Sequence, residues 1–550
     1  MSSETNETEG APTSLAVPGA VGLVAIVALA VALRAWRLGE RSVWFDEAFS
    51  WRLATFSWGE MLHRTTQDNN PPLYYALLKV WMACFGDSPV ALRSLSALAG
   101  ALSCVGTYLM IVEAYARSGN AHQRRVHWIG LFAAALVAVT ALQIRWGWEA
   151  RMYALGAALA PFSSWLLLRA LRAPLGARPS QAAGLADSAG ARAAGRAVAL
   201  GEAWRPWMLY ALVALAFAYT HTYALLSLIA QALFTAGYLL VEARWRPAAL
   251  FANRRFRIAV VGFFLIAAGW LPWLPVLLRQ RAQVREAYWL GPLTRWTVPN
   301  ICRQMFADPE ARTTNDRDAG IAAVACAAVL LALFRRPRAG DWFLLASVGV
   351  PVGLAVAISA ADGNILQVRY FVFTQVFLLA ALARMVGRIT HWPERTIVGA
   401  VVLGSLLLLH VEFLDRLDVP GIHGLRAAAE HVAARRKPGE PVVVSSPYFF
   451  LPMLYYLRGD PACRLLRPGR RLLHYEGTAA LSEADLIASS ELAALAGERA
   501  WVVGNLTGRP SGWREQTRAA FYESYGVPGA VVVVCSTHLL QRPLPACLAR

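Results

Sequence analysis

The stretch SLAVPGAVGLVAIVALAVAL, residues 14–33, decides the fold class of this chain. It carries no charged side chain and has roughly the 20 residues that an α-helix needs to cross a bilayer. Similar runs recur along most of the 550 residues, and the chain is 57% hydrophobic with a mean hydropathy of +0.41. A soluble protein of this size is much less apolar. The sequence therefore predicts a polytopic α-helical membrane protein.

Eleven membrane spans are predicted, and the arginines between them indicate an orientation. With the N-terminus in the cytoplasm, all four arginine-bearing short connections fall on the cytoplasmic side. The segments 35–90 and 279–318 then face outward despite their arginines, because long segments translocate with less regard to charge. The spans cover approximately residues 14–34, 91–113, 127–145, 150–170, 205–220, 222–242, 258–278, 319–334, 342–360, 370–388 and 396–413, and the four connections are 114–126, 171–204, 243–257 and 335–341.

The character of the chain changes after the last span. Short β-branched runs alternate there with helical stretches, which predicts a small α/β domain with a buried parallel sheet over residues 415–550. An odd number of spans places this domain outside the cytoplasm. We also expect residues 1–13 to be a disordered cytoplasmic tail and 173–203, rich in Ala, Gly and Arg, to be a flexible linker. The runs are 441–444, 501–504 and 531–534, and the helical stretches are 425–436 and 489–495.

The charge and the cysteines exclude some classes of function. The formal net charge is +18, but the positive charge is almost all arginine in predicted loops, and no nucleic-acid-binding motif is present. Positive-inside loops and contacts with lipid phosphate explain it better, so no nucleic-acid partner is predicted. None of the seven cysteines is paired at a metal-binding spacing. A bridge among Cys463, Cys535 and Cys547 is conceivable in an exported domain, but the sequence does not assign one.

The first outward loop carries two adjacent acids, Asp46 and Glu47, within the aromatic stretch Trp44–Trp51. Adjacent positions of a helix point about 100° apart, so both acids cannot face one atom. We expect one to face a reacting centre and the other to pair with an arginine such as Arg41 or Arg52. An apolar surrounding makes a carboxylate more basic, as a general base requires. A bare acidic pair is more often an ordinary solvated turn, and only the aromatic setting favours the functional interpretation.

The same loop continues with Asp68-Asn69-Asn70-Pro71-Pro72-Leu73-Tyr74-Tyr75. The prolines end the preceding element, and a helix can begin at Leu73. Asp68 and the asparagines would then gather at the N-terminus of that helix, a place suited to an anion or a metal ion. A helix cap near the membrane is the equally supported alternative, and Asp68 could also contact an acceptor.

Three further polar groups are predicted on the same outer face. Glu149-Ala150-Arg151-Met152-Tyr153 follows the third span, His221 lies between the fifth and sixth, and Arg369-Tyr370 opens the tenth. Each alone could be an interfacial anchor or a hydrogen-bonded structural group. Their shared side is the stronger argument. No nucleotide-binding or hydrolase motif is present, so we expect an activated donor to be carried on a lipid.

These motifs together resemble the family-39-like glycosyltransferases of the membrane-embedded GT-C class, which includes protein O-mannosyltransferases and the aminoarabinose transferases that modify lipid A. The resemblance is dense over residues 36–225 and rests beyond them on general layout. It implies that residues 14–413 form a GT-C-like catalytic domain. The matching stretches are Trp44-Phe45-Asp46-Glu47-Ala48, Asn70-Pro71-Pro72-Leu73-Tyr74-Tyr75, Ala91-Leu92-Arg93-Ser94-Leu95-Ser96-Ala97, Glu149-Ala150-Arg151-Met152-Tyr153 and His221.

The resemblance implies transfer of a sugar from a polyprenyl-phosphate donor to an acceptor outside the cytoplasm, with inversion. Asp46 would accept the proton of the acceptor hydroxyl, with Glu47 in support. Cationic and hydrogen-bonding groups would stabilise the leaving phosphate. Some relatives have a lysine or histidine where this chain has Asn70, so a phosphate contact by this loop is not implied. The candidate phosphate-binding residues are Arg93, Arg151, Tyr153, Arg369, Tyr370 and Lys79, and the candidates for shaping the site or binding the acceptor are Asp68, Asn70, Tyr74, Tyr75 and His221.

Several points stay open on the sequence alone. The acceptor could be lipid A, another glycan, a glycolipid or a protein, and a divalent metal ion is neither required nor excluded. A bacterial plasma membrane is the expected location. Two other classes compete with the transferase: a flippase or other transporter of lipid-linked glycans, and an envelope polysaccharide polymerase or ligase. A transporter would place ionisable groups in mid-span and show repeat symmetry, whereas the acids here gather at one membrane face.

Overall fold

The computed structural model describes most of the chain. The predicted disordered tail lies outside the described residues, as do residues 174–188 of the predicted linker. The described residues are 17–116, 120–173, 189–287, 290–307, 309, 315–417, 424–495, 499–505, 512–524 and 532–542.

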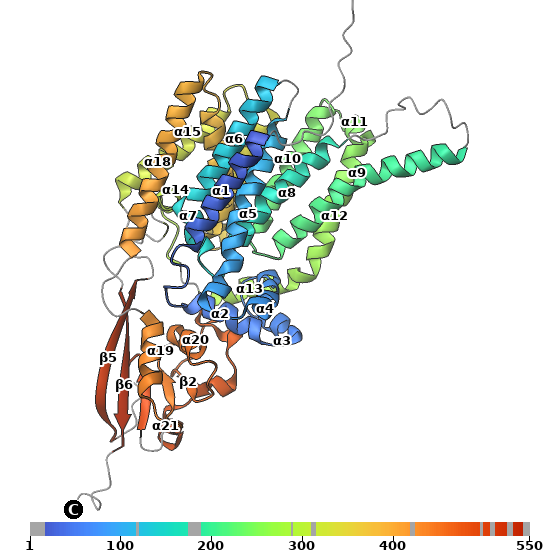
Figure 1. The fold of residues 1–550 in the computed structure, drawn as a ribbon. Helices are drawn as coiled ribbons and strands as arrows, with labels where there is room; N and C mark the ends of the chain where they lie inside the picture. Colours follow the sequence, from blue (N-terminus) through green and yellow to red (C-terminus); the bar gives the residue numbers. More distant parts are fainter. Residues whose placement is uncertain are drawn as a thin grey trace, which may run out of the picture.

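A bundle of apolar helices forms the larger part of the molecule (Figure 1). Among the described residues, seven helices are long and apolar enough to cross a membrane, or eight when the bent pair α6 and α7 counts as one span. Every one of the eleven predicted spans coincides with a helix, so the protein is a polytopic membrane protein, as predicted. The bundle helices are α1 (Val17–Ala35), α5 (Pro89–Tyr115), α6 (Asn120–Val139), α7 (Ala141–Gly147), α8 (Tyr153–Arg172), α9 (Ala189–Ala218), α10 (Ala224–Glu242), α12 (Arg254–Trp270), η2 (Leu271–Trp273), α13 (Leu274–Glu286), α15 (Asp316–Leu333), α16 (Ala339–Asp362), η3 (Val368–Phe371), α17 (Val372–Val386) and α18 (Trp392–Leu417).

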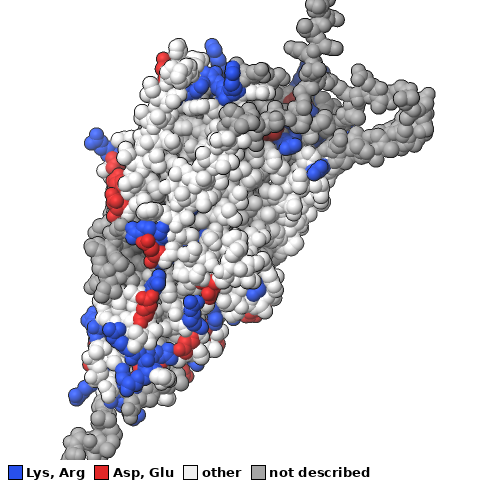
Figure 2. Space-filling view, viewed as in Figure 1, with Lys and Arg blue, Asp and Glu red and all other residues white. Residues whose placement is uncertain are grey.

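The polar parts of the molecule separate to the two ends of this bundle. The short helices α2 (Phe45–Thr55), α3 (Trp58–Thr65) and α4 (Leu73–Phe85) lie with the C-terminal domain at one end, and α11 (Pro247–Ala252) lies at the other (Figure 1). On the face drawn in Figure 2, a broad area of the bundle shows no charged side chain, while Lys, Arg, Asp and Glu gather toward the ends. The first outward loop and the C-terminal domain therefore share one end, as the sequence predicts.

Two predictions for the connections need correction. Residues 189–203 of the predicted linker belong to α9, which begins at Ala189. The segment 279–318 is more than a loop, because α14 (Thr297–Phe306) packs along α15 and contacts α7. Ile301 and Met305 bury one face of α14, and the amide of Gln375 on α17 donates to the carbonyl of Met305 at 2.5 Å. A helix with one apolar face is stable there because the bundle covers that face.

The C-terminal domain is a six-stranded sheet with helices, in the strand order β3-β2-β1-β4-β6-β5. Strands β1 to β4 are parallel neighbours, as predicted, whereas β6 pairs antiparallel with both β4 and β5, so the sheet is mixed. Cys463 is a buried free thiol. The side chain of Cys535 and all of Cys547 lie outside the described part. The elements are α19 (Gly424–Arg435), β1 (Val442–Val444), α20 (Pro447–Tyr456), β2 (Cys463–Leu466), η4 (His474–Glu476), η5 (Thr478–Ala480), η6 (Glu483–Asp485), β3 (Leu486–Ile487), α21 (Ser489–Leu495), β4 (Arg499–Val503), β5 (Arg514–Ser524) and β6 (Val532–Gln541).

This domain is fastened to the first outward loop by specific contacts. The backbone amide of Val43 donates to the hydroxyl of Tyr456 at 2.6 Å, and the rings of Trp51 and Tyr455 meet edge to face at 5.2 Å. The guanidinium of Arg64 on α3 donates to two carbonyls of the segment after η4, those of Ala479 (2.9 Å) and Leu481 (2.8 Å). Buried backbone acceptors satisfied by a charged donor fix the segment in place.

Candidate active site

Asp46 lies in the first turn of α2, at the end of the bundle that carries the C-terminal domain. The helix begins there because the Glu47 carboxylate accepts the backbone amide of Trp44 at 3.4 Å, in the manner of a capping box. The carboxylate of Asp46 lies 3.6 Å from the guanidinium of Arg369 in η3, and both side chains are about one-fifth exposed (19% and 20%). Such a separation is an ion pair without the length of a direct hydrogen bond.

Glu47 points away from Asp46 into the protein and is 1% exposed. Its two oxygens accept from Arg93 at 2.8 and 2.6 Å, and the backbone amide of Ala150 donates to it at 3.0 Å. The two acids therefore point to different sides, and Glu47 pairs with an arginine as predicted, but the predicted partners Arg41 and Arg52 are wrong. A residue on α5 provides the partner instead, because α2 packs with this face toward the bundle.

Arg93 has its other donors engaged as well. They reach the carbonyls of Leu38 (2.7 Å), Arg41 (3.0 Å) and Ser42 (2.9 Å). Lys79 is similarly used, because its ammonium donates to the carbonyls of Ala54 (3.1 Å) and Phe56 (2.6 Å) at the end of α2. Arg93 and Lys79 therefore stabilise the backbone on the two sides of α2. Their contact with a lipid phosphate stays a prediction that the geometry does not favour.

Arg151, in the turn before α8, is the buried cation of the site, at 6% exposed. Its guanidinium lies 3.2 Å from the Tyr75 hydroxyl and 3.4 Å from the Ser50 hydroxyl, which donates in turn to the backbone carbonyl of Asp46 at 3.0 Å. It also lies over the ring of Phe49 at 5.9 Å. Its Nε is buried and has no hydrogen-bond partner among the described residues. A buried donor without a partner is costly, which marks a place for a ligand acceptor.

Asp68 and Tyr75 extend this network. The hydroxyl of Tyr75 donates to the Asp68 carboxylate at 2.9 Å, and the amide of Asn70 donates to the same oxygen at 3.3 Å. Helix α4 begins at Leu73, as predicted, and the backbone amide of Leu73 donates to the carbonyl of Tyr219 at 3.2 Å, which ties the loop to the end of α9. Tyr74 points elsewhere: it is fully buried.

The Tyr74 hydroxyl shares a hydrogen bond of 2.8 Å with Ser96 on α5. Ser96 in turn donates to the backbone carbonyl of Arg151 at 3.1 Å. Tyr74 therefore supports the turn that carries Arg151 and does not line the site itself.

His221 is a neutral aromatic neighbour of the cluster. It packs against the rings of Tyr153 (5.8 Å) and Tyr370 (5.2 Å), and its Nδ1 accepts the backbone amide of Tyr223 at 3.0 Å. Burial, helped by Arg151 and Arg369, lowers the pKa of His221 to about 3. The imidazole is therefore uncharged at neutral pH and lines the cluster as a polar aromatic group.

The structure thus brings together most of the predicted residues around Asp46. Their chain positions are far apart, but α2, α4, the turn before α8, the α9–α10 turn and η3 all end at the same face of the bundle. The residues of the cluster are Asp46, Asp68, Asn70, Tyr75, Arg151, Tyr153, His221, Arg369 and Tyr370.

The C-terminal domain adds a wall that the sequence motifs did not reveal. Tyr448 at the start of α20 meets Phe45, the neighbour of Asp46, edge to face at 5.2 Å. Burial raises the pKa of Tyr448 to about 12, with Glu476, Tyr475 and Asp46 adding to the effect. Exposed Arg470 donates to Glu476 in the same segment at 2.8 Å.

His474 lies at the same wall. Burial lowers its pKa, whereas nearby Asp68 and Glu286 act in the opposite direction. The segment around η4 also contacts the first loop directly, because Arg64 on α3 donates to the carbonyls of Ala479 and Leu481. The Nε2 of His474 is buried without a hydrogen-bond partner among the described residues.

The donor set does not form an evident metal site. No group of three or more His, Cys, Asp or Glu side chains that could hold a metal ion occurs within the part of the chain that the structure describes. The two acids of the cluster, Asp46 and Asp68, contact Arg369 and Tyr75 respectively. We therefore assign no step of the chemistry to a metal ion.

Comparison with known proteins adds information on layout. No protein-family model matches the chain, and no curated protein sequence matches it. An oligosaccharyltransferase of Archaeoglobus fulgidus, solved with Zn and sulfate, is similar over 88% of this chain and 67% of its own, with 12% identity and a TM-score of 0.49. ArnT from Cupriavidus metallidurans in the apo state is similar over 95% and 98%, with 15% identity and a TM-score of 0.47.

A third structure, the Pmt1-Pmt2 protein O-mannosyltransferase complex of S. cerevisiae bound to its sugar donor, covers 48% of this chain and 34% of its own, with 14% identity and a TM-score of 0.33. These are the kinds of enzyme that the sequence motifs resemble. At such identities and TM-scores the likeness concerns the general layout of the helices. The function proposed below rests on the residues of the site.

Proposed function

We propose that this protein is a membrane glycosyltransferase that moves a sugar from a polyprenyl-phosphate donor to an acceptor hydroxyl at the outer face of the membrane. The observation that carries the proposal is the ion pair between a partly exposed acid, Asp46, and Arg369, with Arg151 contacting Ser50 one turn further along α2. A base and a phosphate-binding pair within one cluster is the minimum that such a transfer requires.

Asp46 acts as the general base in the proposed reaction. It accepts the proton of the acceptor hydroxyl while that oxygen forms a bond to the anomeric carbon. The bond between the anomeric carbon and the phosphate oxygen breaks, and the polyprenyl phosphate leaves with its electron pair, which inverts the configuration. Glu47 is a positioning residue, because its carboxylate is used by Arg93 and Ala150.

The leaving phosphate is the proposed ligand of the arginines. Arg369 lies 3.6 Å from the Asp46 carboxylate and 5.4 Å from the centre of the Tyr370 ring, so a phosphate bound beside Asp46 would contact this guanidinium. The buried Nε of Arg151 offers a second donor. Tyr153 and Tyr370 lie beside His221 and supply hydroxyl donors at the same place. Because His221 is neutral, the positive charge of the site comes from Arg151 and Arg369.

The acceptor is proposed to enter between the first outward loop and the C-terminal domain. Tyr448 and Arg470 border this side, and Asp68 with Asn70 borders the opposite one. Aromatic faces and alternating donors and acceptors suit the hydrocarbon faces and hydroxyl groups of a sugar ring, so a glycan or glycolipid acceptor is favoured over a protein. The arrangement supports a multi-pass enzyme of a bacterial plasma membrane, with its N-terminus cytoplasmic and residues 415–550 outside.

The decisive experiment compares the purified wild type with Asp46→Asn in detergent, using labelled polyprenyl-phosphate sugars. We expect transfer or donor hydrolysis by the wild type and a loss of about 10²–10⁴-fold in the variant, the usual contribution of a general base. Glu60→Gln is the matched control, because Glu60 is an exposed acid of the same loop. Full activity of Asp46→Asn would disprove the base assignment. Movement of intact lipid-linked sugar between leaflets would show a transporter instead.

A further inference from the structure

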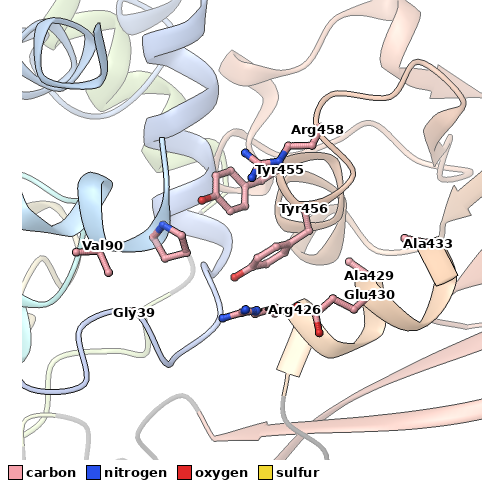
Figure 3. Close-up of a pocket in the computed structure, with 10 residues that line it drawn as sticks. Gly39, Val90, Arg426, Ala429, Glu430, Ala433, Tyr455, Tyr456 and Arg458 are labelled. Atoms are coloured by element: carbon pink, nitrogen blue, oxygen red, sulfur yellow. Dashed lines mark hydrogen bonds and ion pairs between the residues drawn. The ribbon is translucent and has the colours of Figure 1, made fainter. Parts of the chain in front are cut away.

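A cavity lies between the bundle and the C-terminal domain, behind the catalytic loop. Its volume is about 410 Å³, and Figure 3 shows side chains of α19 and α20 facing the N-terminus of α5 across it. The Glu47–Arg93 pair separates it from Asp46, because Arg93 lies one turn along α5 from the cavity residue Val90. The lining residues are Gly39, Pro89, Val90, Arg426, Ala429, Glu430, Ala433, Tyr455, Tyr456 and Arg458.

The cavity lies at the level where membrane spans end. Helix α5, which is a candidate span, begins at Pro89, and Val90 is half exposed. Two large aromatic residues at the neighbouring span ends are exposed, Trp36 by 62% and Phe85 by 61%. Exposed aromatic residues at the ends of spans mark the interface between hydrocarbon and headgroups. Lipid headgroups are therefore the most concentrated polar ligands next to this cavity.

The charges around the cavity are balanced. Arg426 pairs with Glu430 at 2.8 Å, and Arg458 pairs with Asp87 at 3.2 Å. All four side chains are more than one-third exposed, and pairs of this kind contribute little to stability. A ligand that carries one charge of each sign can contact the arginines and Glu430 at once and keeps the group neutral, while Asp87 is exposed enough to be solvated. An anion alone would leave Glu430 as a repulsive neighbour.

Two further observations favour a ligand there. Arg458 has a φ of +57°, a left-handed conformation in which glycine or asparagine is less strained. A residue in this conformation commonly ends a helix, and here the turn after α20 places Arg458 at the border of the cavity (Figure 3). The ring of Tyr456 lies between Arg426 and Arg458 in the same view and offers a face to a cation.

We propose that this cavity binds the headgroup of a zwitterionic phospholipid of the ethanolamine type. The guanidinium groups of Arg426 and Arg458 bind the phosphate, Glu430 and the ring of Tyr456 bind the ammonium, and Val90 contacts the start of the acyl chains. This site is separate from the proposed transfer of a sugar and does not depend on it. A bound lipid would join α19 and α20 to the end of α5 and hold the C-terminal domain at the membrane surface.

The test measures the melting temperature of the purified full-length protein in detergent as short-chain lipids are added below their micellar concentration. We expect dihexanoyl-phosphatidylethanolamine to stabilise the wild type saturably, at a half-saturating concentration at least ten-fold lower than that of dihexanoyl-phosphatidylglycerol. Free phosphoethanolamine is expected to act far more weakly, because it lacks the chains that contact Val90. Equal binding of the free headgroup would show a site for a soluble phosphate ester and overturn the lipid proposal.

Variants separate this site from the general lipid belt. Arg426→Gln with Arg458→Gln should raise the half-saturating concentration of the ethanolamine lipid at least ten-fold, and Glu430→Gln should abolish the preference over the glycerol lipid. Val90→Trp, which fills the cavity without removing a charge, should weaken both lipids and serves if the double variant fails to fold. Arg467→Gln is the matched control, since Arg467 is an exposed, paired arginine elsewhere on the domain. An equal response of all variants, or a wild-type preference for the anionic lipid, would overturn the proposal.

Discussion

Two clusters of buried charge lie at opposite ends of the bundle and are built from the same residue types. At the end away from the C-terminal domain, the fully buried Asp341 accepts from Arg384 (2.9 Å) and the Tyr115 hydroxyl (2.8 Å), and Arg388 lies 3.2 Å away. At the other end, Asp46 is one-fifth exposed, and its ion pair with Arg369 is 3.6 Å long. The carboxylate of Asp341 is surrounded by short hydrogen bonds, whereas the carboxylate of Asp46 is held by a longer ion pair.

The difference distinguishes a structural charge from a functional one. The backbone amide of Arg338 completes the shell of Asp341 at 2.8 Å, so no ligand can approach it without breaking the packing of α16 against α17. The carboxylate of Glu47 is also surrounded by short hydrogen bonds, although Glu47 is the neighbour of Asp46 in sequence. Charge pairing alone therefore does not indicate a functional site. A carboxylate with few contacts and one exposed side is the better indicator.

The largest effect on stability is expected at the cluster around Asp341. Asp341→Asn leaves two buried arginines without their carboxylate, and breaking such a pair costs about 3–5 kcal/mol. We expect a much lower melting temperature in detergent, with the activity of the folded fraction retained. Asp318→Asn, at an exposed acid in the first turn of α15, should leave the melting temperature unchanged. A stable but inactive Asp341→Asn would mean that both clusters are functional.

The largest effect on catalysis after Asp46 is expected at Arg369. Arg369→Gln removes a charge from the leaving phosphate, and loss of one such stabilising group lowers kcat by about 10²–10³-fold. The melting temperature should change little, since the ion pair is long and partly exposed. Steady-state kinetics with a labelled lipid-phosphate sugar measure the effect, with the exposed Arg295→Gln as the control. A change in stability with kcat intact would place Arg369 among the structural charges.

A smaller and selective effect is expected at the wall contributed by the C-terminal domain. Tyr448→Ala should reduce transfer to a glycan acceptor by about ten-fold, the size of one lost aromatic contact of about 1.4 kcal/mol. Donor hydrolysis by water should persist, because Asp46 and the arginines are untouched. Product analysis that separates transferred from hydrolysed sugar tests this. Equal loss of both products would mean that Tyr448 shapes the donor side or the fold.

The smallest effect concerns His221 and acid. The folded pKa of about 3 lies below the ordinary value of 6.5, so the unfolded chain binds more protons between these pH values. The stability that His221 contributes is present above pH 6.5 and is lost progressively as the pH falls toward 3. His221→Gln should flatten this part of the profile of melting temperature against pH. The exposed His391→Gln should leave the profile of the wild type, and a similar flattening in that variant would refute the assignment.

The sequence predicted where the apolar helices of the bundle lie, because an apolar run of bilayer length has few other stable structures. Among the described residues, seven or eight of these helices are long and apolar enough to cross a membrane. It also predicted the start of α4 at Leu73 from two prolines, and the gathering of Arg151, His221 and Arg369 near Asp46 from the order of the spans. These predictions needed only local signals and the alternation of sides.

The remaining features depend on packing between distant segments. The choice of Arg93 as partner of Glu47 depends on how α2 is rotated against α5, which no local pattern encodes. Helix α14 is stable only beside α15, and β6 joins the sheet antiparallel because β5 precedes it as a hairpin partner. The contact of Tyr448 with Phe45 joins two domains, so neither stretch carries a signal of it.

The wide separation in sequence between Asp46 and Arg369 has a consequence for biogenesis. Asp46 leaves the ribosome with the segment after the first apolar helix, whereas Arg369 arrives only with one of the last helices of the bundle, and Tyr448, which contacts the neighbour of Asp46, follows later still. A partly inserted chain therefore contains the base without its phosphate partner. The proposed transfer would therefore not act on lipid donors in the same membrane until synthesis of the chain is nearly complete.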